Sequence, residues 1–436
     1  CQCKDAENRA HPVVFYSDDD GLTWDRTMLE TVAAHRADWP HADVRWQNYA
    51  NEPTVVELLT GRLWMLIRTS QDRHYESFSD DGGVSWTTPK PSRFYGTITM
   101  PTFFRLQDGR ILLFWCNTTP LPELDHTTQP ELQEWERTGL TEDVFTNRDA
   151  LHAAISEDDG QSWIGFRELT LNERRNDSDF RTSGGNSESL DKSVHQSQAV
   201  ELPEGKILVS HGQHHLCRRL VIFDPAWLYE TERSDDFRLG LGGWSTQLYV
   251  KSIVGNFRGF SGHCAYNRRP GPQLIPDPDG QPREVLQIAR HADPRLVHEI
   301  QGAVWNFPAG RSGTLQLEIR LPQGSQGLRV CLLDRWFNPG DLVAHHFAQY
   351  VLEISGGGRI NNTAATVVAD TWQELQLEWT DGAPARFRIA STGDWIEVPL
   401  RAGSSNGISY LHLQSRAAAV DTVGVLLRKV AVHTGR

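Results

Sequence analysis

The stretch SDDDGLTW at residues 17–24 decides the fold, because it recurs twice along the chain. It returns as SDDGGVSW at residues 79–86 and as SEDDGQSW at residues 156–163, and all three copies fit the pattern S-x-D-x-G-x-[ST]-W. Each copy follows a short apolar or alternating run. A motif that recurs after successive strands is typical of a repeat architecture, so each copy is predicted to be the turn of a β-hairpin.

The residue types of the motif suit such a turn. The carboxylate of Asp19, Asp81 or Asp158 can accept backbone N–H groups, and the glycine that follows adopts a positive φ angle without steric cost. The tryptophan ring can pack beneath the turn. We therefore predict a structural role for these aspartates and no catalytic role.

A second repeated element lies between the motifs. Residues 52–68, 100–115 and 196–210 each have the pattern of a strand, a turn and a second strand, with a glycine at the bend. One such hairpin and the hairpin of one motif together make four antiparallel strands, which is the repeating unit of a β-propeller. The sequence thus predicts an all-β fold.

The pattern changes after residue 256. The motifs stop, a Pro/Gly-rich segment follows at residues 269–280, and short alternating strands continue from there. These strands are expected at residues 303–307, 314–321, 327–333, 350–354, 374–379, 408–414 and 423–432. Their spacing is typical of a β-sandwich. We predict two domains, a propeller over residues 1–256 and a lectin-like β-sandwich over residues 257–436.

Composition argues against several classes of function. The 43 basic and 56 acidic side chains give a net charge of −13, which disfavours binding to nucleic acid. Apolar runs stay well short of the roughly 18 residues of a membrane-spanning helix, so no membrane partner is expected. The first residue is Cys1, and the start of the propeller is expected to be missing.

Neither a metal ion nor another cofactor is predicted. The six cysteines are scattered without the paired spacing of a zinc site. His211, His214 and His215 lie close together in the sequence, but alternate residues of a strand point to opposite faces of the sheet. Their spacing therefore does not make a convincing ligand set.

The three motifs resemble the Asp boxes, or BNR repeats, of the sialidase (neuraminidase) superfamily, and the resemblance extends from the first residues to about residue 230. It implies a β-propeller of the six-bladed type. The strand pattern that follows resembles the concanavalin and laminin-G β-sandwiches. In sialidases, an arginine triad binds the substrate carboxylate, a tyrosine–glutamate pair acts as nucleophile, and an aspartate is the acid/base.

The resemblance assigns four of these roles by position. Glu52, in NEPTVVEL, stands where the family places the glutamate that polarises the nucleophile, and Arg68 stands where the second triad arginine belongs. Arg148 precedes the third motif as the last triad arginine does. Asp5 lies upstream of Ser17 at a spacing similar to that of the family's acid.

The position of the tyrosine is taken by other residues. Glu52 stands nine positions before Gly61, and the position nine before Gly205 is Gln196, with His195 beside it. His195 is the natural candidate for a replacement base, because histidine titrates near neutral pH. Unless a tyrosine enters from another loop, we expect inversion through an activated water.

The hypothesis from sequence is an exo-acting glycoside hydrolase that removes a terminal acidic sugar, sialic acid or a related keto-acid or uronic acid, from a glycan. Arginine forks bind a planar carboxylate with two parallel hydrogen bonds, which suits such a sugar. Two alternatives stay open. The first is a polysaccharide lyase or neutral-sugar glycosidase on the same propeller, and the second is a carbohydrate-binding protein without catalysis.

Overall fold

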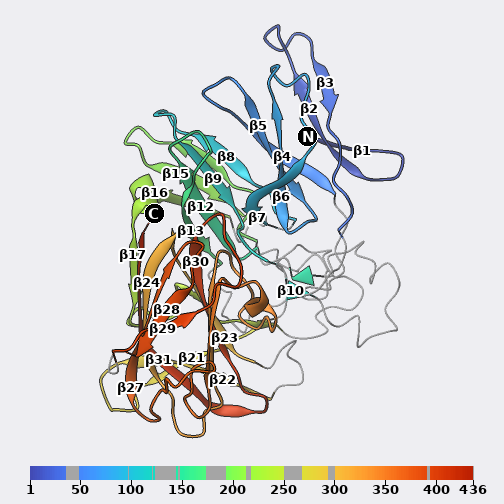
Figure 1. Cartoon of the computed structure of the whole chain (residues 1–436). Coiled ribbons are helices and arrows are strands. Elements are labelled where there is room, and N and C mark those ends of the chain that lie inside the picture. Colours follow the sequence, from blue (N-terminus) through green and yellow to red (C-terminus); the bar gives the residue numbers. More distant parts are fainter. Residues whose placement is uncertain are drawn as a thin grey trace. The chain divides into compact units, whose positions relative to one another are not determined.

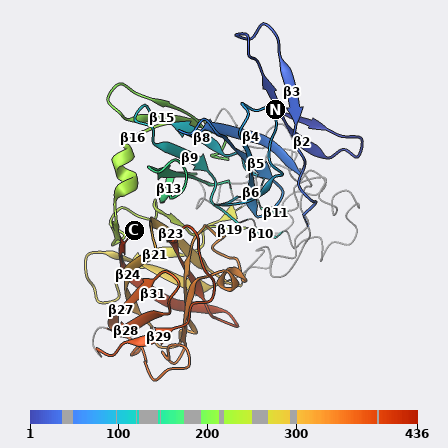
Figure 2. The same cartoon turned by 45° about the horizontal axis from the view of Figure 1, so that its top comes forward.

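The computed structural model describes residues 1–35, 49–96, 98–119, 121–122, 144–145, 148–172, 193–212, 218–249, 268–292, 300–389 and 393–435. The chain forms two compact units, the first holding the described residues up to Leu228 and the second those from Tyr229 onward. Both units are built of β-strands, so the predicted all-β class is confirmed (Figures 1 and 2).

Over its described ranges, the first unit contains four antiparallel sheets of three or four strands. The first sheet has β1 (Gln2–Lys4), β2 (Ala10–Tyr16) and β3 (Asp25–Met28). The second has β4 (Ala50–Glu57), β5 (Leu63–Thr69), β6 (Arg73–Ser79) and β7 (Lys90–Tyr95). The third has β8 (Thr102–Arg105), β9 (Ile111–Trp115), β12 (Ala150–Ser156) and β13 (Ile164–Leu171). The fourth has β14 (Gln198–Glu201), β15 (Ile207–His211) and β16 (Arg219–Phe223).

These sheets are the blades of the predicted propeller. Strand β4 lies beside β8, and β8 lies beside β14, so the first strands of three successive sheets are neighbours. All three motifs join the last two strands of a blade, and all three expected inner hairpins are present. A further short pair, β10 (Leu121–Pro122) with β11 (Val144–Phe145), and a 3₁₀ turn at Pro225–Tyr229 complete the elements of this unit.

The three boxes share one hydrogen-bond pattern, illustrated here by the third. The Ser162 backbone N–H and hydroxyl donate to Asp158 at 2.7 and 2.5 Å, and the Ser156 hydroxyl donates to the same carboxylate at 2.9 Å. The Trp163 indole donates to the carbonyl of Gly160, whose φ is 91°. The first and second boxes repeat these bonds around their own aspartates.

The carboxylates of the first two boxes are strongly held in the ionised form. Hydrogen bonds from Thr23 lower the pKa of Asp19 to about 2, and those from Ser85 lower the pKa of Asp81 to about 2. Each carboxylate is already occupied by its own turn. These contacts agree with the structural role predicted for the boxes.

The third box also joins two blades. Asp159 accepts a hydrogen bond of 2.7 Å from the backbone N–H of Leu59 and forms an ion pair of 2.8 Å with Arg105. The Trp163 ring lies edge-on to Phe94 with the ring centres 5.2 Å apart, and 6.2 Å from the ring centre of Trp64. The second and third blades thus share one aromatic core.

The second unit is a sandwich of two sheets in its described residues. The larger sheet runs β21 (Gln273–Pro276), β22 (Glu284–Arg290), β31 (Asp421–Gly435), β24 (Ser312–Arg320), β27 (Trp372–Thr380), β28 (Ala385–Ile389) and β29 (Ile396–Val398), with β17 (Glu232–Asp235) also paired to β31. The smaller runs β18 (Trp244–Ser245), β23 (Gly302–Gly310), β30 (Ile408–Ser415), β25 (Gly327–Leu333) and β26 (Tyr350–Ser355). Strand β19 (Leu248–Tyr249) pairs with β20 (Arg268–Arg269), and a 3₁₀ turn lies at Ala344–His346.

All seven strands expected in this region are present, and one apolar core lies between the two sheets. Trp244 is part of that core. Its ring stacks on Trp305 with the ring centres 5.7 Å apart, and its indole N–H donates to Asp235. Core packing therefore accounts for this tryptophan.

The sandwich begins earlier along the chain than the boundary we placed between residues 256 and 257. Strand β17 pairs with β31 and β18 pairs with β23, so residues 232–245 contribute strands to the second unit. The physical reason is that β31 is 15 residues long and offers a free edge to β17 beyond its pairing with β22.

Candidate functional site

Glu52 and Arg68 form an ion pair at one end of the second blade. Arg68 Nη1 donates to Glu52 Oε2 at 2.5 Å, and the Arg68 side chain is only 4% exposed whereas that of Glu52 is 33% exposed. The pairing of β4 with β5 is irregular between Asn51 and Thr54, and Glu52 has a φ of 38°. This displacement from the regular ladder is what lets Glu52 reach the arginine.

Arg148 is fully buried just before β12. Its guanidinium donates to the carbonyl of Ile98, and its own carbonyl accepts a hydrogen bond of 2.8 Å from the Val194 backbone N–H. The second of these bonds fixes the chain beside His195, the next residue. Arg148 and His195 are thus brought together although 47 positions separate them.

The charges of Arg68 and Arg148 both affect the pKa of His195. Burial lowers the pKa of His195 well below its ordinary value, and the positive charges of Arg148 and Arg68 lower it further. The ring is completely buried. At neutral pH it is therefore an uncharged imidazole that is affected by the charges of two guanidinium groups.

A second buried histidine joins this cluster. His74 Nε2 donates to the carbonyl of Thr99 at 3.0 Å, and burial followed by the charge of Arg68 lowers the pKa of His74 to about 3. His74 is not among the site residues predicted from the sequence. It is the second residue of β6 and follows Arg68 by six positions, and a single histidine at that spacing does not differ in sequence from an ordinary core histidine.

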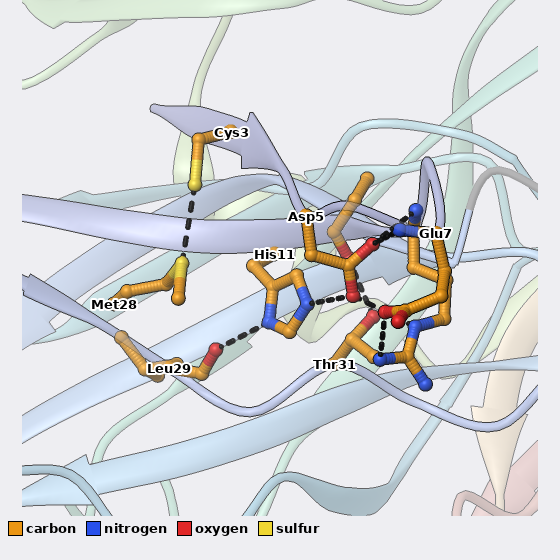
Figure 3. A network of polar contacts seen from close by, with 9 residues as sticks. Cys3, Asp5, Glu7, His11, Met28, Leu29 and Thr31 are labelled. Carbon is orange, nitrogen blue, oxygen red and sulfur yellow. Dashed lines mark hydrogen bonds and ion pairs between the residues drawn. The ribbon is translucent and has the colours of Figure 1, made fainter.

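Asp5 belongs to a different set of contacts, in the turn between β1 and β2 (Figure 3). Its carboxylate accepts hydrogen bonds from Arg9 Nε at 2.7 Å and from the Arg9 and Glu7 backbone N–H groups. His11 Nε2 lies 3.0 Å from the same carboxylate, and His11 Nδ1 lies 2.9 Å from the Leu29 carbonyl oxygen. Over the described ranges, these contacts do not include Glu52 or Arg68.

The network also sets the charge of Asp5. Partial burial acts to raise the pKa of Asp5, but the hydrogen bonds from His11 and Arg9 outweigh it and hold the pKa well below its usual range. Asp5 is therefore ionised at neutral pH. In this form it can accept the hydrogen bonds that stabilise the turn but has no proton to donate.

The stability of the protein is expected to depend on pH through this carboxylate. Because the folded pKa is depressed, Asp5 contributes stability above its unfolded pKa of about 4, and the contribution is lost as the pH falls toward the folded pKa. The melting temperature of Asp5→Asn should thus lie below that of the wild type at pH 7, and the gap should narrow at pH 3. A gap of equal size at both values would contradict this account.

The contacts join four of the six predicted site residues in two pairs, Arg68 with Glu52 and Arg148 with the chain beside His195. Arg68 contacts Glu52 directly, and the charges of Arg68 and Arg148 lower the pKa of His195 in addition to burial. Gln196 follows His195, has a φ of 58° and is partly exposed. Glu52 offsets the charge of Arg68, and Arg148 adds a second guanidinium group near the uncharged imidazole. Guanidinium groups of this kind can bind an anionic group.

Comparison with known proteins agrees with this architecture. Residues 2–218 match the model of the BNR repeat-like domain. The N-terminal half of the chain is therefore a BNR repeat-like domain. No curated protein matches the chain in sequence.

Solved structures similar to the BNR repeat-like domain and its sandwich include glycosidases. The Trypanosoma rangeli sialidase in complex with 2,3-difluorosialic acid is 14% identical with a TM-score of 0.32, and the match covers all of this chain and 66% of the sialidase. The xylan β-1,4-xylosidase of Bacillus halodurans is 10% identical with a TM-score of 0.29, covering 98% of this chain and 81% of that one. Another sialidase is covered over only 33% of its length. The chain thus spans less than two thirds of the sialidases it matches, and likeness at this level assigns neither activity nor substrate.

Two observations bear on metals and membranes. Among the residues that the structure describes, the BNR repeat-like domain and the sandwich hold no group of three or more His, Cys, Asp or Glu side chains placed to bind a metal ion. His214 and His215 lie outside the described residues. A helix long and apolar enough to cross a membrane is likewise not found in the described part of the chain.

Proposed function

We propose that the BNR repeat-like domain binds a glycan through a terminal acidic sugar, sialic acid or a related keto-acid or uronic acid, and hydrolyses the bond to that sugar. The observation that carries this proposal is the ion pair of Arg68 with Glu52, together with the backbone bond that holds Arg148 beside the chain at His195. A carboxylate is the sugar substituent that guanidinium forks bind best.

In this proposal Glu52 is a positioning residue. Its 2.5 Å contact with Arg68 orients the guanidinium, because a buried arginine held by one carboxylate has few other rotamers available. The Glu52 side chain is 33% exposed, so a ligand can reach it. Glu52 would thus present Arg68 to the substrate and could act on the reacting water as well.

His195 is proposed as the base. Burial and, after it, the charges of Arg148 and Arg68 lower the pKa of His195 in the free protein. An incoming carboxylate that offsets those charges would raise that pKa and make the imidazole more basic. Because the ring is completely buried in the free protein, substrate binding would also have to open it to a water, which it would then activate for inversion of the anomeric carbon. Asp5 would have to leave Arg9 and His11 before it could donate a proton, so we assign it no catalytic step, and the proton for the leaving oxygen would come from solvent water.

One observation also favours a second candidate, a lyase that cleaves uronate chains. Such an enzyme abstracts the proton next to a carboxylate, and neutral imidazole beside two arginines suits that step. The products separate the two reactions. Hydrolysis releases the acidic sugar itself, whereas elimination leaves an unsaturated uronate that absorbs in the ultraviolet.

The test is product analysis after incubation with sialosides, uronides and neutral aryl glycosides. We expect a free acidic sugar from a sialoside or uronide and no product from the neutral glycosides. An unsaturated uronate among the products would show that the protein is a lyase and not a hydrolase. Turnover of neutral glycosides alone, or binding without turnover on every substrate, would overturn the proposal in favour of a neutral-sugar glycosidase or a carbohydrate-binding protein.

A further inference from the structure

A pocket of about 700 Å³ lies at one edge of the sandwich. Strand β26 is the last strand of the smaller sheet and β29 is the last strand of the larger sheet, and the two strands are neighbours at this edge. Residues of both strands line the pocket, together with residues of the segments that follow β26, β29 and β30. A volume of this size can hold a small ligand such as a sugar.

The residues of β26 that line the pocket all lie on one face of the strand. They are Val351, Glu353 and Ser355, whereas Leu352 and Ile354 are buried in the apolar core between the sheets. Successive side chains of a strand point to opposite faces of the sheet, so this alternation is expected. The Glu353 side chain therefore lies on the side of the pocket and not of the core.

Two arginines hold the carboxylate of Glu353. Arg329 Nε and Nη2 each lie 3.0 Å from Glu353 Oε1. Arg416, which also lines the pocket, places its Nη2 atom 3.2 Å from Glu353 Oε2. Because one negative charge stands against two guanidinium groups, this part of the pocket keeps an excess of positive charge.

Two further arginines of the lining, Arg359 and Arg401, have no carboxylate partner within the part of the sandwich that the structure describes. Arg359 Nε donates to the Thr363 carbonyl at 2.9 Å, which fixes the direction of the Arg359 side chain. The side chain of Arg401 is exposed and makes no hydrogen bond or ion pair to any described residue. Its guanidinium N–H groups are therefore available to a ligand.

Arg401 belongs to the same cluster of charges as the pair of Arg329 and Glu353. The Arg401 backbone N–H donates to the Gln349 carbonyl at 2.9 Å, which holds the residue beside the start of β26. Arg329 Nη1 lies 3.2 Å from His345 Nδ1. Burial lowers the pKa of His345 to about 4, and the charges of Arg329 and Arg401 lower it further. Both arginines thus act on one ring, which is uncharged at neutral pH.

Positive charge exceeds negative charge around the pocket. The lining contains three arginines and two glutamates, and Arg329 beside Glu353 adds a fourth arginine, so four positive charges stand against two negative ones. The second glutamate, Glu397, is the cross-strand partner of Arg386, which places another positive charge next to it. In a chain whose net charge is −13, such a local excess favours an anionic ligand.

Neutral polar groups lie beside these arginines. Asn361 Oδ1 accepts the Glu353 backbone N–H at 2.8 Å, which leaves the amide NH₂ group of Asn361 for a ligand. Asn362, the next residue, is exposed and also lines the pocket. Among the residues described around the pocket none is aromatic, so a ligand is bound there through polar groups. Amide groups of this kind suit the hydroxyls of a sugar.

We propose that this pocket of the sandwich binds an acidic sugar through the carboxylate or sulfate group of that sugar. Arg401 binds the anionic group, Arg359 and Arg416 add positive charge, and Asn361 and Asn362 bind hydroxyls of the same sugar unit. The inference goes beyond the proposed function, because it assigns a ligand to the second unit and does not require hydrolysis by the first.

The test is ligand-observed NMR titration of the full chain with galactose, galactose 6-sulfate, galacturonate and inorganic sulfate. These probes contain no glycosidic bond, so they are not turned over. We expect at least one acidic sugar to bind about tenfold or more tighter than galactose, because a charge-assisted hydrogen bond has an effect of that size. Arg401→Gln should lower the affinity for that sugar about tenfold and leave galactose binding unchanged. Since Arg401 is exposed, the melting temperature should stay at the wild-type value.

Lys429→Gln is the matched control, because Lys429 is an exposed cation of β31 in the larger sheet and is not part of the pocket lining among the described residues. The inference is overturned if Lys429→Gln loses as much affinity as Arg401→Gln, if galactose binds as tightly as the acidic sugars, or if no probe binds. Inorganic sulfate that binds as tightly as the acidic sugars would overturn the assignment to a sugar.

Arg68→Lys in the same titrations separates this inference from the proposed function. A loss of affinity in Arg68→Lys without one in Arg401→Gln contradicts the site in the sandwich alone. The reverse result contradicts the proposed role of Arg68 alone. A partial loss in each variant is the result expected if both proposals hold, because each unit then binds the acidic sugar on its own.

Discussion

Replacement of Arg68 by alanine is expected to lower kcat/KM on an acidic glycan by about a hundredfold or more, because the loss of one preorganised donor at a charged centre has effects of that size. Arg62→Ala should leave kcat/KM unchanged. The two arginines stand at opposite ends of β5, but the side chain of Arg62 is 40% exposed and pairs with Asp80 at the surface. The measurement is the steady-state kinetics of both variants, in which the released sugar is quantified.

The loss of Arg68 also breaks a largely buried ion pair, which typically costs about 3–5 kcal/mol of stability. Arg68→Lys therefore accompanies the alanine variant. Lysine keeps a positive charge near Glu52 but lacks the planar fork that grips a carboxylate. The lysine variant should fold and still lose activity. Wild-type activity in a folded variant of either kind would rule out Arg68 as the carboxylate ligand.

Glu52→Gln extends the same experiment to the role of Glu52. If Glu52 acts only by holding Arg68, the double variant Glu52→Gln/Arg68→Ala should be no less active than Arg68→Ala alone. If Glu52 also acts on the reacting water, the two losses should add. Full activity of Glu52→Gln would contradict both roles.

The blades could be predicted from sequence because their signals are local. Each box contains its own acceptor, donors and positive-φ glycine within eight residues, so the bonds of Asp158 with Ser156 and Ser162 need no distant partner. The alternating strands of the sandwich are local in the same sense, and all seven were found. Strand β17 has no such signal, since its partner β31 lies about 200 residues later.

The candidate site was only partly predictable for the same reason. Position along the family pattern indicated Arg68, Arg148 and His195, and the electrostatic coupling of these residues agrees with a common location. The contact between Glu52 and Arg68 depends on an irregular strand pairing and a positive φ at a glutamate, which composition does not reveal. The partners of Asp5 depend likewise on a turn geometry that brings His11 back to the carboxylate.

The second large effect is expected where two blades share a core. Trp163→Ala should destabilise the first unit by about 3–5 kcal/mol, because the removal of a buried aromatic ring leaves a cavity. Trp163 is 6% exposed and packs against Phe94 and Trp64. Trp24 holds the same place in the first box and makes the same indole bond to its glycine carbonyl, but it is 62% exposed. Trp24→Ala should cost less than about 1 kcal/mol.

Two buried thiols allow the destabilisation to be assigned to one unit. Cys116 is buried beside β9 in the first unit and Cys331 lies within β25 in the second, so the labelling rate of each thiol reports the opening of its own unit. A loss of 3 kcal/mol should accelerate labelling of Cys116 about a hundredfold in Trp163→Ala. Labelling of Cys331 should stay at the wild-type rate. If Cys116 were labelled at equal rates in Trp163→Ala and Trp24→Ala, the aromatic core shared by the second and third blades would not be the source of the lost stability. The box turn, which both tryptophans have in common, would then be its source.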